Sequence, residues 1–322
     1  MVKQILPNLY RVKIPLPESP LRTLNSYFIV SPERCLIIDT GMNQEECLRR
    51  MQSALRELNV DLKRTDFFIT HWHADHLGLV STLAAPNSRI YFNQKEARIL
   101  TSTFKERWWG IVEFARRHGF PKEELESVFN THPARYGFKE HLDFSIVKEG
   151  DEISIGDYNF VCLETPGHSP GHLCLYEPNK KVLISGDHLL EDISPNVSLY
   201  SDKANPLQEY LDSLDRIYEL EVQLVLPGHG RIFQNHRRRV RELKRHHEAR
   251  VGEVLSLLKK GEQTAYEIAS QMSWELNYKN WEDFPAFQKW FAFGEALSHL
   301  AYLEEKGLVA RRINNEVKFY LK

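Results

Sequence analysis

The stretch Thr70–Gly78, THWHADHLG, places three histidines and one aspartate within six positions, directly after the apolar run DFFIT. Imidazole nitrogens bind zinc, iron or manganese at about 2.0 to 2.2 Å. Alternate residues on a tight turn after a strand can serve two adjacent ions, with His71 and His73 facing one and Asp75 and His76 the other. The alternative, a histidine-rich solvent loop, does not explain why further ligand types recur downstream.

Three more ligand types stand at the ends of later predicted strands: His168 in TPGHSPGH, Asp187 in SGDH and His229 in PGHG. Glycine and proline flank each of them, as expected where the backbone must turn sharply to bring a side chain into a shared cleft. Seven ligands are too many for one tetrahedral ion and suit two ions that share a carboxylate, for which Asp187 is the candidate. The sequence therefore predicts two divalent cations, zinc first, with iron or manganese as alternatives.

Around these motifs, short β-rich runs alternate with amphipathic segments, which indicates an α/β fold. Between the motifs, an aromatic, helical insertion covers about residues 94–140. Its stripe of Trp108, Val112 and Ala115 is typical of local core, although the position of the insertion also suggests a lid and an apolar substrate wall. Further elements are a hairpin that turns at Pro178 and Asn179 and helices over 43–58, 206–220 and 235–260.

The C-terminal part reads as helix, helix and two-stranded hairpin, the order of a winged helix. We therefore expect a catalytic domain over 1–235, a connecting helix over 236–260 and a winged-helix domain over 261–322. Residues 251–322 carry nine Lys or Arg and ten Asp or Glu, a balance of 9 − 10 = −1. Nucleic-acid affinity depends on Lys and Arg that neutralise phosphates, so nucleic-acid binding by this module is not expected. Its aromatic residues supply more apolar surface than a solvated linker needs: Trp274, Tyr278, Trp281, Phe284, Phe287, Trp290 and Phe291. The module is therefore expected to pack against the catalytic domain or a second subunit, as in a homodimer.

The bulk properties exclude several other classes of protein. The 322 residues have a formal charge of −2, which gives no reason to expect a polyanion partner for the whole molecule. No run approaches the roughly 18 to 20 apolar residues of a membrane span, and a cytoplasmic location with no membrane partner is expected. The four cysteines are far apart in the sequence, which indicates buried thiols in place of a disulfide framework or a thiolate zinc site.

Taken together, the HxHxDH motif and the later His, Asp and His resemble the metallo-β-lactamase superfamily over about the first 230 residues. The resemblance implies a four-layer αββα sandwich with the metals at one edge of the paired sheets. It also implies which ligands serve which ion: His71, His73 and His168 the first, Asp75, His76 and His229 the second, and Asp187 both. Asp39, at the end of CLIIDTG, matches an aspartate that supports the ligand loop from behind, with a simple strand-end cap as the alternative.

Within this superfamily, the segments GDHLLEDISPNVSLY and HRRRVRE and the winged-helix tail look like a bacterial branch related to β-lactamase-like protein 2. Some members of that group act on RNA. Neither Cys162 nor Cys174 occupies a ligand position, in contrast to many antibiotic-hydrolysing relatives.

The predicted activity is metal-dependent hydrolysis by a hydroxide that bridges the two ions, with Asp75 and Asp187 as the carboxylates at the reacting centre. A small ester, thioester or lactone-like molecule is the expected substrate, because an aromatic insertion would form a compact, partly apolar pocket. A ribonuclease or other phosphodiesterase is the alternative, motivated by the basic segment Arg237–Arg245. A DNA-binding regulator is a third interpretation, which the complete ligand set disfavours.

Overall fold

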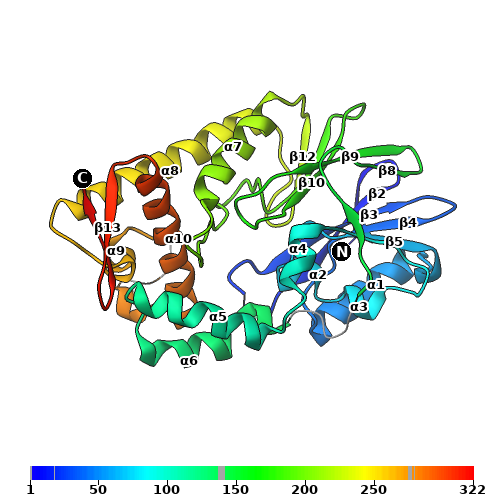
Figure 1. Cartoon of the computed structure of the whole chain (residues 1–322). Coiled ribbons are helices and arrows are strands. Elements are labelled where there is room, and N and C mark those ends of the chain that lie inside the picture. The colour runs from blue at the N-terminus through cyan, green and yellow to red at the C-terminus, as the bar shows by residue number, and fades with distance from the viewer. Residues whose placement is uncertain (1, 18, 137–141, 275–277, 279) are drawn as a thin grey trace. The chain divides into compact units, whose positions relative to one another are not determined.

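The computed structural model describes residues 2–17, 19–136, 142–274, 278 and 280–322. These residues form two compact units. Unit 1 comprises residues 1–101, 133–195 and 216–239, and unit 2 comprises residues 102–132, 196–215 and 240–322. Figure 1 shows the elements of each unit along the colour ramp from the N-terminus to the C-terminus.

Unit 1 contains a seven-stranded sheet whose strands follow one another in sequence order. The first four strands pair antiparallel and the last four, from β4 onward, pair parallel. The strands are β1 (Val2–Leu6), β2 (Leu9–Pro15), β3 (Thr23–Val30), β4 (Cys35–Ile38), β5 (Thr65–Phe68), β6 (Ile90–Asn93) and β7 (Ser145–Val147). The helices between them are α1 (Glu45–Glu57), α2 (Ala74–Leu77), α3 (Val80–Leu83) and α4 (Gln94–Ile99), with the short 3-10 turns η1 (Leu62–Arg64) and η2 (Pro133–Tyr136).

A second sheet in unit 1 has five strands in the order β12, β11, β10, β9, β8. The strands are β8 (Glu152–Ile155), β9 (Tyr158–Glu164), β10 (Leu173–Glu177), β11 (Val182–Gly186) and β12 (Leu224–Pro227). Strands β10 and β11 form the predicted antiparallel hairpin, and β11 pairs parallel with β12.

Helices α7 (Pro206–Glu219) and α8 (His236–Leu258) confirm the predicted helices to within two residues at each end.

Alternation along the strands explains how unit 1 is layered. One face of the first sheet packs on α1, α2 and α3, through Phe28, Ile37 and Phe67 against Met51 and other apolar side chains of the helices. The opposite face meets the second sheet in a core that includes Tyr27, Ile38, Phe68, Phe160 and Ile184. Since successive side chains of a strand point to opposite faces, one sheet can fill both cores. The predicted paired sheets are present.

The described residues of unit 2 form helices and one hairpin. The elements of unit 2 are α5 (Phe104–Arg117), α6 (Lys122–Thr131), α9 (Ala265–Gln271), the 3-10 turn η3 (Trp281–Asp283), α10 (Ala286–Glu305), β13 (Val309–Ile313) and β14 (Val317–Leu321), together with most of α7 and α8. The predicted order of helix, helix and hairpin is therefore present at the C-terminus. The assignment of this segment to the winged-helix class stays a prediction.

The compact units divide the chain differently from the predicted domains. Residues 102–132 of the insertion group with the C-terminal segment, and residues 137–140 of it lie outside the described residues. The physical reason is aromatic packing: Trp108 is buried, its ring centroid lies 4.9 Å from that of Trp290, and Phe120 lies 5.2 Å from Trp290. Trp108 thus belongs to the local core, whereas Trp109 is 64 % exposed. The role of the insertion as a lid stays a prediction.

All four cysteines are unpaired and buried, as the sequence predicts. Among the helices that the structure describes, none is both long and apolar enough to cross a membrane.

Candidate metal centre

The seven predicted ligands come from loops that leave the carboxyl ends of neighbouring strands. His71 follows β5, His73 precedes α2, and Asp75 and His76 lie in the first turn of that helix. The other three stand between β9 and β10, after β11 and after β12: His168, Asp187 and His229. Backbone hydrogen bonds join these ends, since Leu173 N–H donates to Thr70 O at 2.9 Å and Gly228 N–H donates to Gly186 O at 2.8 Å. All seven side chains therefore converge at one edge of the two sheets.

The first set of donors, which we call the histidine trio, consists of His71, His73 and His168. His71 Nε2 lies 2.9 Å from His73 Nδ1 and 3.3 Å from His168 Nε2. His168 Nε2 lies 3.0 Å from His73 Nδ1. Nitrogens bound at about 2.0 to 2.1 Å to one tetrahedral ion stand about 3.3 Å apart, so the spacing of the trio fits a single ion.

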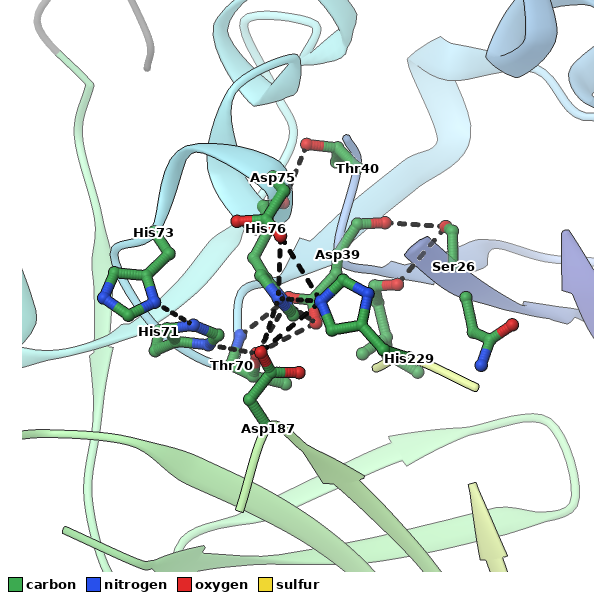
Figure 2. A network of polar contacts seen from close by, with 12 residues as sticks. Ser26, Asp39, Thr40, Thr70, His71, His73, Asp75, His76, Asp187 and His229 are labelled. Atoms are coloured by element: carbon green, nitrogen blue, oxygen red, sulfur yellow. Dashed lines mark hydrogen bonds and ion pairs between the residues drawn. The ribbon is translucent and has the colours of Figure 1, made fainter. Parts of the chain in front are cut away.

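The second set, which we call the mixed group, consists of Asp75, His76 and His229. His229 Nε2 lies 3.3 Å from Asp75 Oδ2 and 3.3 Å from His76 Nε2. Figure 2 shows these side chains pointing toward one another. This spacing also fits one ion.

Asp187 faces both sets of donors (Figure 2). Its Oδ2 lies 3.5 Å from His76 Nε2, 3.4 Å from His229 Nε2 and 3.7 Å from His168 Nε2. Its Oδ1 is buried and has no hydrogen-bond partner among the described residues. A buried carboxylate oxygen without a donor is costly unless a cation faces it. The donor set thus fits two cations, with Asp187 placed to contact both.

Polar groups behind the ligands fix which ring nitrogen faces the centre. Asp39 Oδ2 lies 2.7 Å from His76 Nδ1, and its Oδ1 accepts a hydrogen bond from Thr70 N–H at 2.9 Å. The carbonyl of Thr23 lies 2.9 Å from His229 Nδ1. In both histidines this arrangement leaves Nε2 free to serve as a ligand. Asp39 therefore lies where the resemblance places a supporting carboxylate.

Burial and charge set the protonation of these groups. Burial lowers the pKa of His73 to about 3 and that of His71 well below its ordinary value, so both rings are neutral near pH 7. Burial also acts to lower the pKa of His229, but the nearby carboxylates of Asp187 and Asp75 outweigh this effect and raise the pKa to about 10. Burial would raise the pKa of Asp187, but His229 and His76 hold it well below its usual range. Burial also opposes the charged form of His76, but Asp39, Asp187 and Asp75 raise its pKa well above the ordinary value. A cation bound at these rings would compete with their protons.

Two residues behind the predicted ligands contact the loops that carry them: His172, which the sequence suggests as a supporting or structural residue, and Glu96, which it does not reveal. Nε2 of the buried His172 accepts a hydrogen bond from Asp187 N–H at 3.1 Å, so this histidine supports the centre without being a ligand. Glu96, in α4, is fully buried and accepts hydrogen bonds from both loops that carry the trio. Its sequence environment, QKEAR, resembles any solvated helix, so no local signal could have identified it.

Gly228 provides a test of this geometry. A Cβ atom at position 228 would lie 2.5 Å from Asp187 Oδ1 and 2.9 Å from His76 Cε1, so Asp187 or His76 would have to move. We expect Gly228→Ala to weaken metal binding by about 10- to 100-fold, the range found when support of a ligand is lost. Gly252→Ala, whose added Cβ meets nothing within 4 Å, is the control. Equilibrium dialysis with elemental analysis measures both, and equal affinities in the two variants would contradict the assignment.

With this geometry established, comparison with known proteins shows what the chain is similar to. A model of the metallo-beta-lactamase superfamily matches residues 20–229. A probable metallo-hydrolase of Bacillus subtilis, YqjP, is 27 % identical over 315 residues, covering 91 % of this chain and 92 % of its own. A beta-lactamase-like protein 2 homolog of Caenorhabditis elegans is 23 % identical over 254 residues, covering 78 % of this chain and 71 % of its own. The crystal structure of a metallo-beta-lactamase family protein of Thermus thermophilus superposes with a TM-score of 0.83 at 30 % identity, covering 99 % of this chain and 100 % of that one.

Proposed function

The chain belongs to the metallo-beta-lactamase superfamily, and on that premise we propose that it is a dinuclear hydrolase of a small ester, thioester or lactone. The observation that carries the proposal is the position of Asp187 Oδ2, within 3.7 Å of nitrogens from both the trio and the mixed group. A carboxylate placed between two donor sets is suited to contact a pair of cations. Zinc is the metal that we propose first, because nitrogen-rich tetrahedral sets suit it.

When bound, two divalent cations supply a nucleophilic water at neutral pH and polarise the oxygen that gathers charge during hydrolysis. The protein holds the donors for this chemistry. Asp75 and Asp187 contribute two negative charges, so the loaded centre stays electropositive toward a developing oxyanion. Asp39 and the Thr23 carbonyl orient the rings of His76 and His229 from behind.

The internal contacts of helix α8 disfavour a polynucleotide substrate. Arg237 Nε donates to Tyr218 O at 2.9 Å, and Arg238 pairs with Glu191 at 2.5 Å. Arg239 Nε donates to Leu190 O at 2.6 Å, and Lys244 pairs with Asp215 at 2.5 Å. These donors are already engaged within the protein, whereas phosphate binding depends on cationic groups that remain available. At least four of the six cations in the segment that motivated the nuclease alternative thus bond within the protein.

A substrate screen tests the proposal. The purified chain, stripped with a chelator and reloaded separately with zinc, manganese or iron, is assayed with an aryl ester, an acyl thioester, a lactone and bis(p-nitrophenyl) phosphate. We expect a carbonyl substrate to give the highest kcat/KM, with activity lost on chelation and restored by metal. A preference for the phosphodiester would favour the nuclease alternative, and activity that survives full metal removal would overturn the proposal.

A further inference from the structure

We infer that Glu96 is a positioning residue that joins the two loops carrying the histidine trio. Its Oε2 accepts a hydrogen bond from Trp72 N–H at 2.8 Å, and Trp72 stands between His71 and His73. Its Oε1 accepts from Ser169 Oγ at 3.0 Å and from Gly171 N–H at 2.6 Å, in the loop of His168. One carboxylate thus contacts residues beside all three members of the trio.

The chemistry of the contacts explains why a carboxylate is used. All three partners of Glu96 are donors, and an ionised carboxylate is the side chain that only accepts. Its exposed fraction is 0 %, and burying a charge is costly unless it is well hydrogen-bonded. Burial accordingly raises the pKa of Glu96 to about 7, with the donors of Trp72, Gly171 and Ser169 opposing the rise. Glutamine would replace one acceptor by an NH2 group that faces an N–H or O–H donor.

Helix α4, which carries Glu96, is itself fixed in place. Asn93, buried at the start of the helix, accepts from Lys95 N–H at 2.8 Å and donates to Glu164 Oε1 at 3.1 Å. The start of α4 packs closely against the loop of His168. A Cβ atom added at Gly171 in that loop would lie 2.4 Å from Asn93 Oδ1 and 2.9 Å from Glu96 Cγ. Glu96 therefore has a defined position from which it can hold both loops.

The hydrogen bonds of Glu96 lie beside the trio, whereas Asp39 contacts His76 of the mixed group directly and reaches His71 of the trio through Thr70 Oγ1. Loss of Glu96 should therefore weaken one metal site and spare the other. A residue that only stabilised the fold would affect both sites together.

The inference rests on the proposed dinuclear function, and cobalt binding to the metal-free full-length protein tests it. Titration with Co²⁺, followed by visible absorption and by elemental analysis, should give two binding steps in the wild type. In Glu96→Gln we expect one step to weaken by about 10- to 100-fold, the range typical of a lost ligand support, while the other is unchanged. With zinc loaded, kcat should fall more than KM rises, because the disturbed group positions the reacting centre and not the remote part of the substrate.

Two further variants keep the test decisive. Glu96→Asp retains the acceptor on a shorter arm and should recover part of the lost affinity. Glu177→Gln alters another buried carboxylate of unit 1, which accepts from Lys180 N–H, and should leave both steps unchanged. Two wild-type-like steps in Glu96→Gln, or equal weakening of both steps, would overturn the role of Glu96. Fewer than two steps in the wild type would instead overturn the dinuclear function on which the inference rests.

Discussion

Replacing Asp187 by alanine should abolish most of the activity, lowering kcat/KM by more than about 1000-fold. The expected loss exceeds the roughly 10- to 100-fold range for residues behind the ligands, because Asp187 faces both donor sets at once. Asp39→Ala should fall within that lower range, since Asp39 reaches the centre only through Thr70 and His76. Steady-state kinetics and elemental analysis of zinc-loaded protein measure both effects.

The metal content separates the proposed role of Asp187 from a general loss of structure. We expect two equivalents of metal in the wild type and fewer than two in Asp187→Ala, with the metal-free forms of both unfolding at similar temperatures. Equal and mild losses of activity in Asp187→Ala and Asp39→Ala, with two ions retained in each, would contradict the bridging assignment.

Replacing Trp290 by alanine should lower the free energy of unfolding of unit 2 by about 3 to 5 kcal/mol, the usual cost of deleting a large buried aromatic side chain. Trp290 is fully buried, and its ring stacks on Tyr200 with centroids 5.0 Å apart. It also contacts Trp108 and Phe120, so its removal leaves a cavity bordered by three other rings. The neighbouring rings can move only partly into this cavity, so much of the packing energy is lost.

Trp109→Ala is the matched control, because Trp109 is 64 % exposed and should change stability by less than about 0.5 kcal/mol. Urea unfolding followed by intrinsic fluorescence suits the comparison, since five of the six tryptophans lie in unit 2 and only Trp72 lies in unit 1. Similar unfolding midpoints for the two variants would show that the aromatic cluster is not the core of unit 2.

Much of the site could be predicted from sequence because each ligand stands in a recognisable local context. HWHADH follows an apolar strand, and Asp187 and His229 follow strands that end in glycine-containing turns. Once those strands are paired, their carboxyl ends meet at one edge, so the convergence of the ligands follows from the topology. The structure brings all seven side chains together there, and Asp39 with them.

The support of the site could not be predicted in the same way. Glu96 is 73 residues from Ser169, and its three donors are defined only when β6, β9 and the ligand loops are in place. The basic run of α8 likewise looks like a solvated or phosphate-binding surface until its partners are known. Hydrogen bonds between distant segments leave no periodic pattern in the sequence, because any polar residue can make them.

The sequence by itself thus determined the α/β class, the main helices and hairpins, and which histidines and aspartates cluster at the site, since these depend on local periodicity and on residue chemistry at strand ends. Only the tertiary structure decided which loops Glu96 joins, which partners Arg237, Arg238 and Arg239 of α8 bind, and that residues 102–132 pack with the C-terminal helices. The apolar stripe that contains Trp108 shows that this face of the helix must be buried, but not which segment covers it. The hydrophobic effect is non-directional, so any apolar surface can bury the stripe.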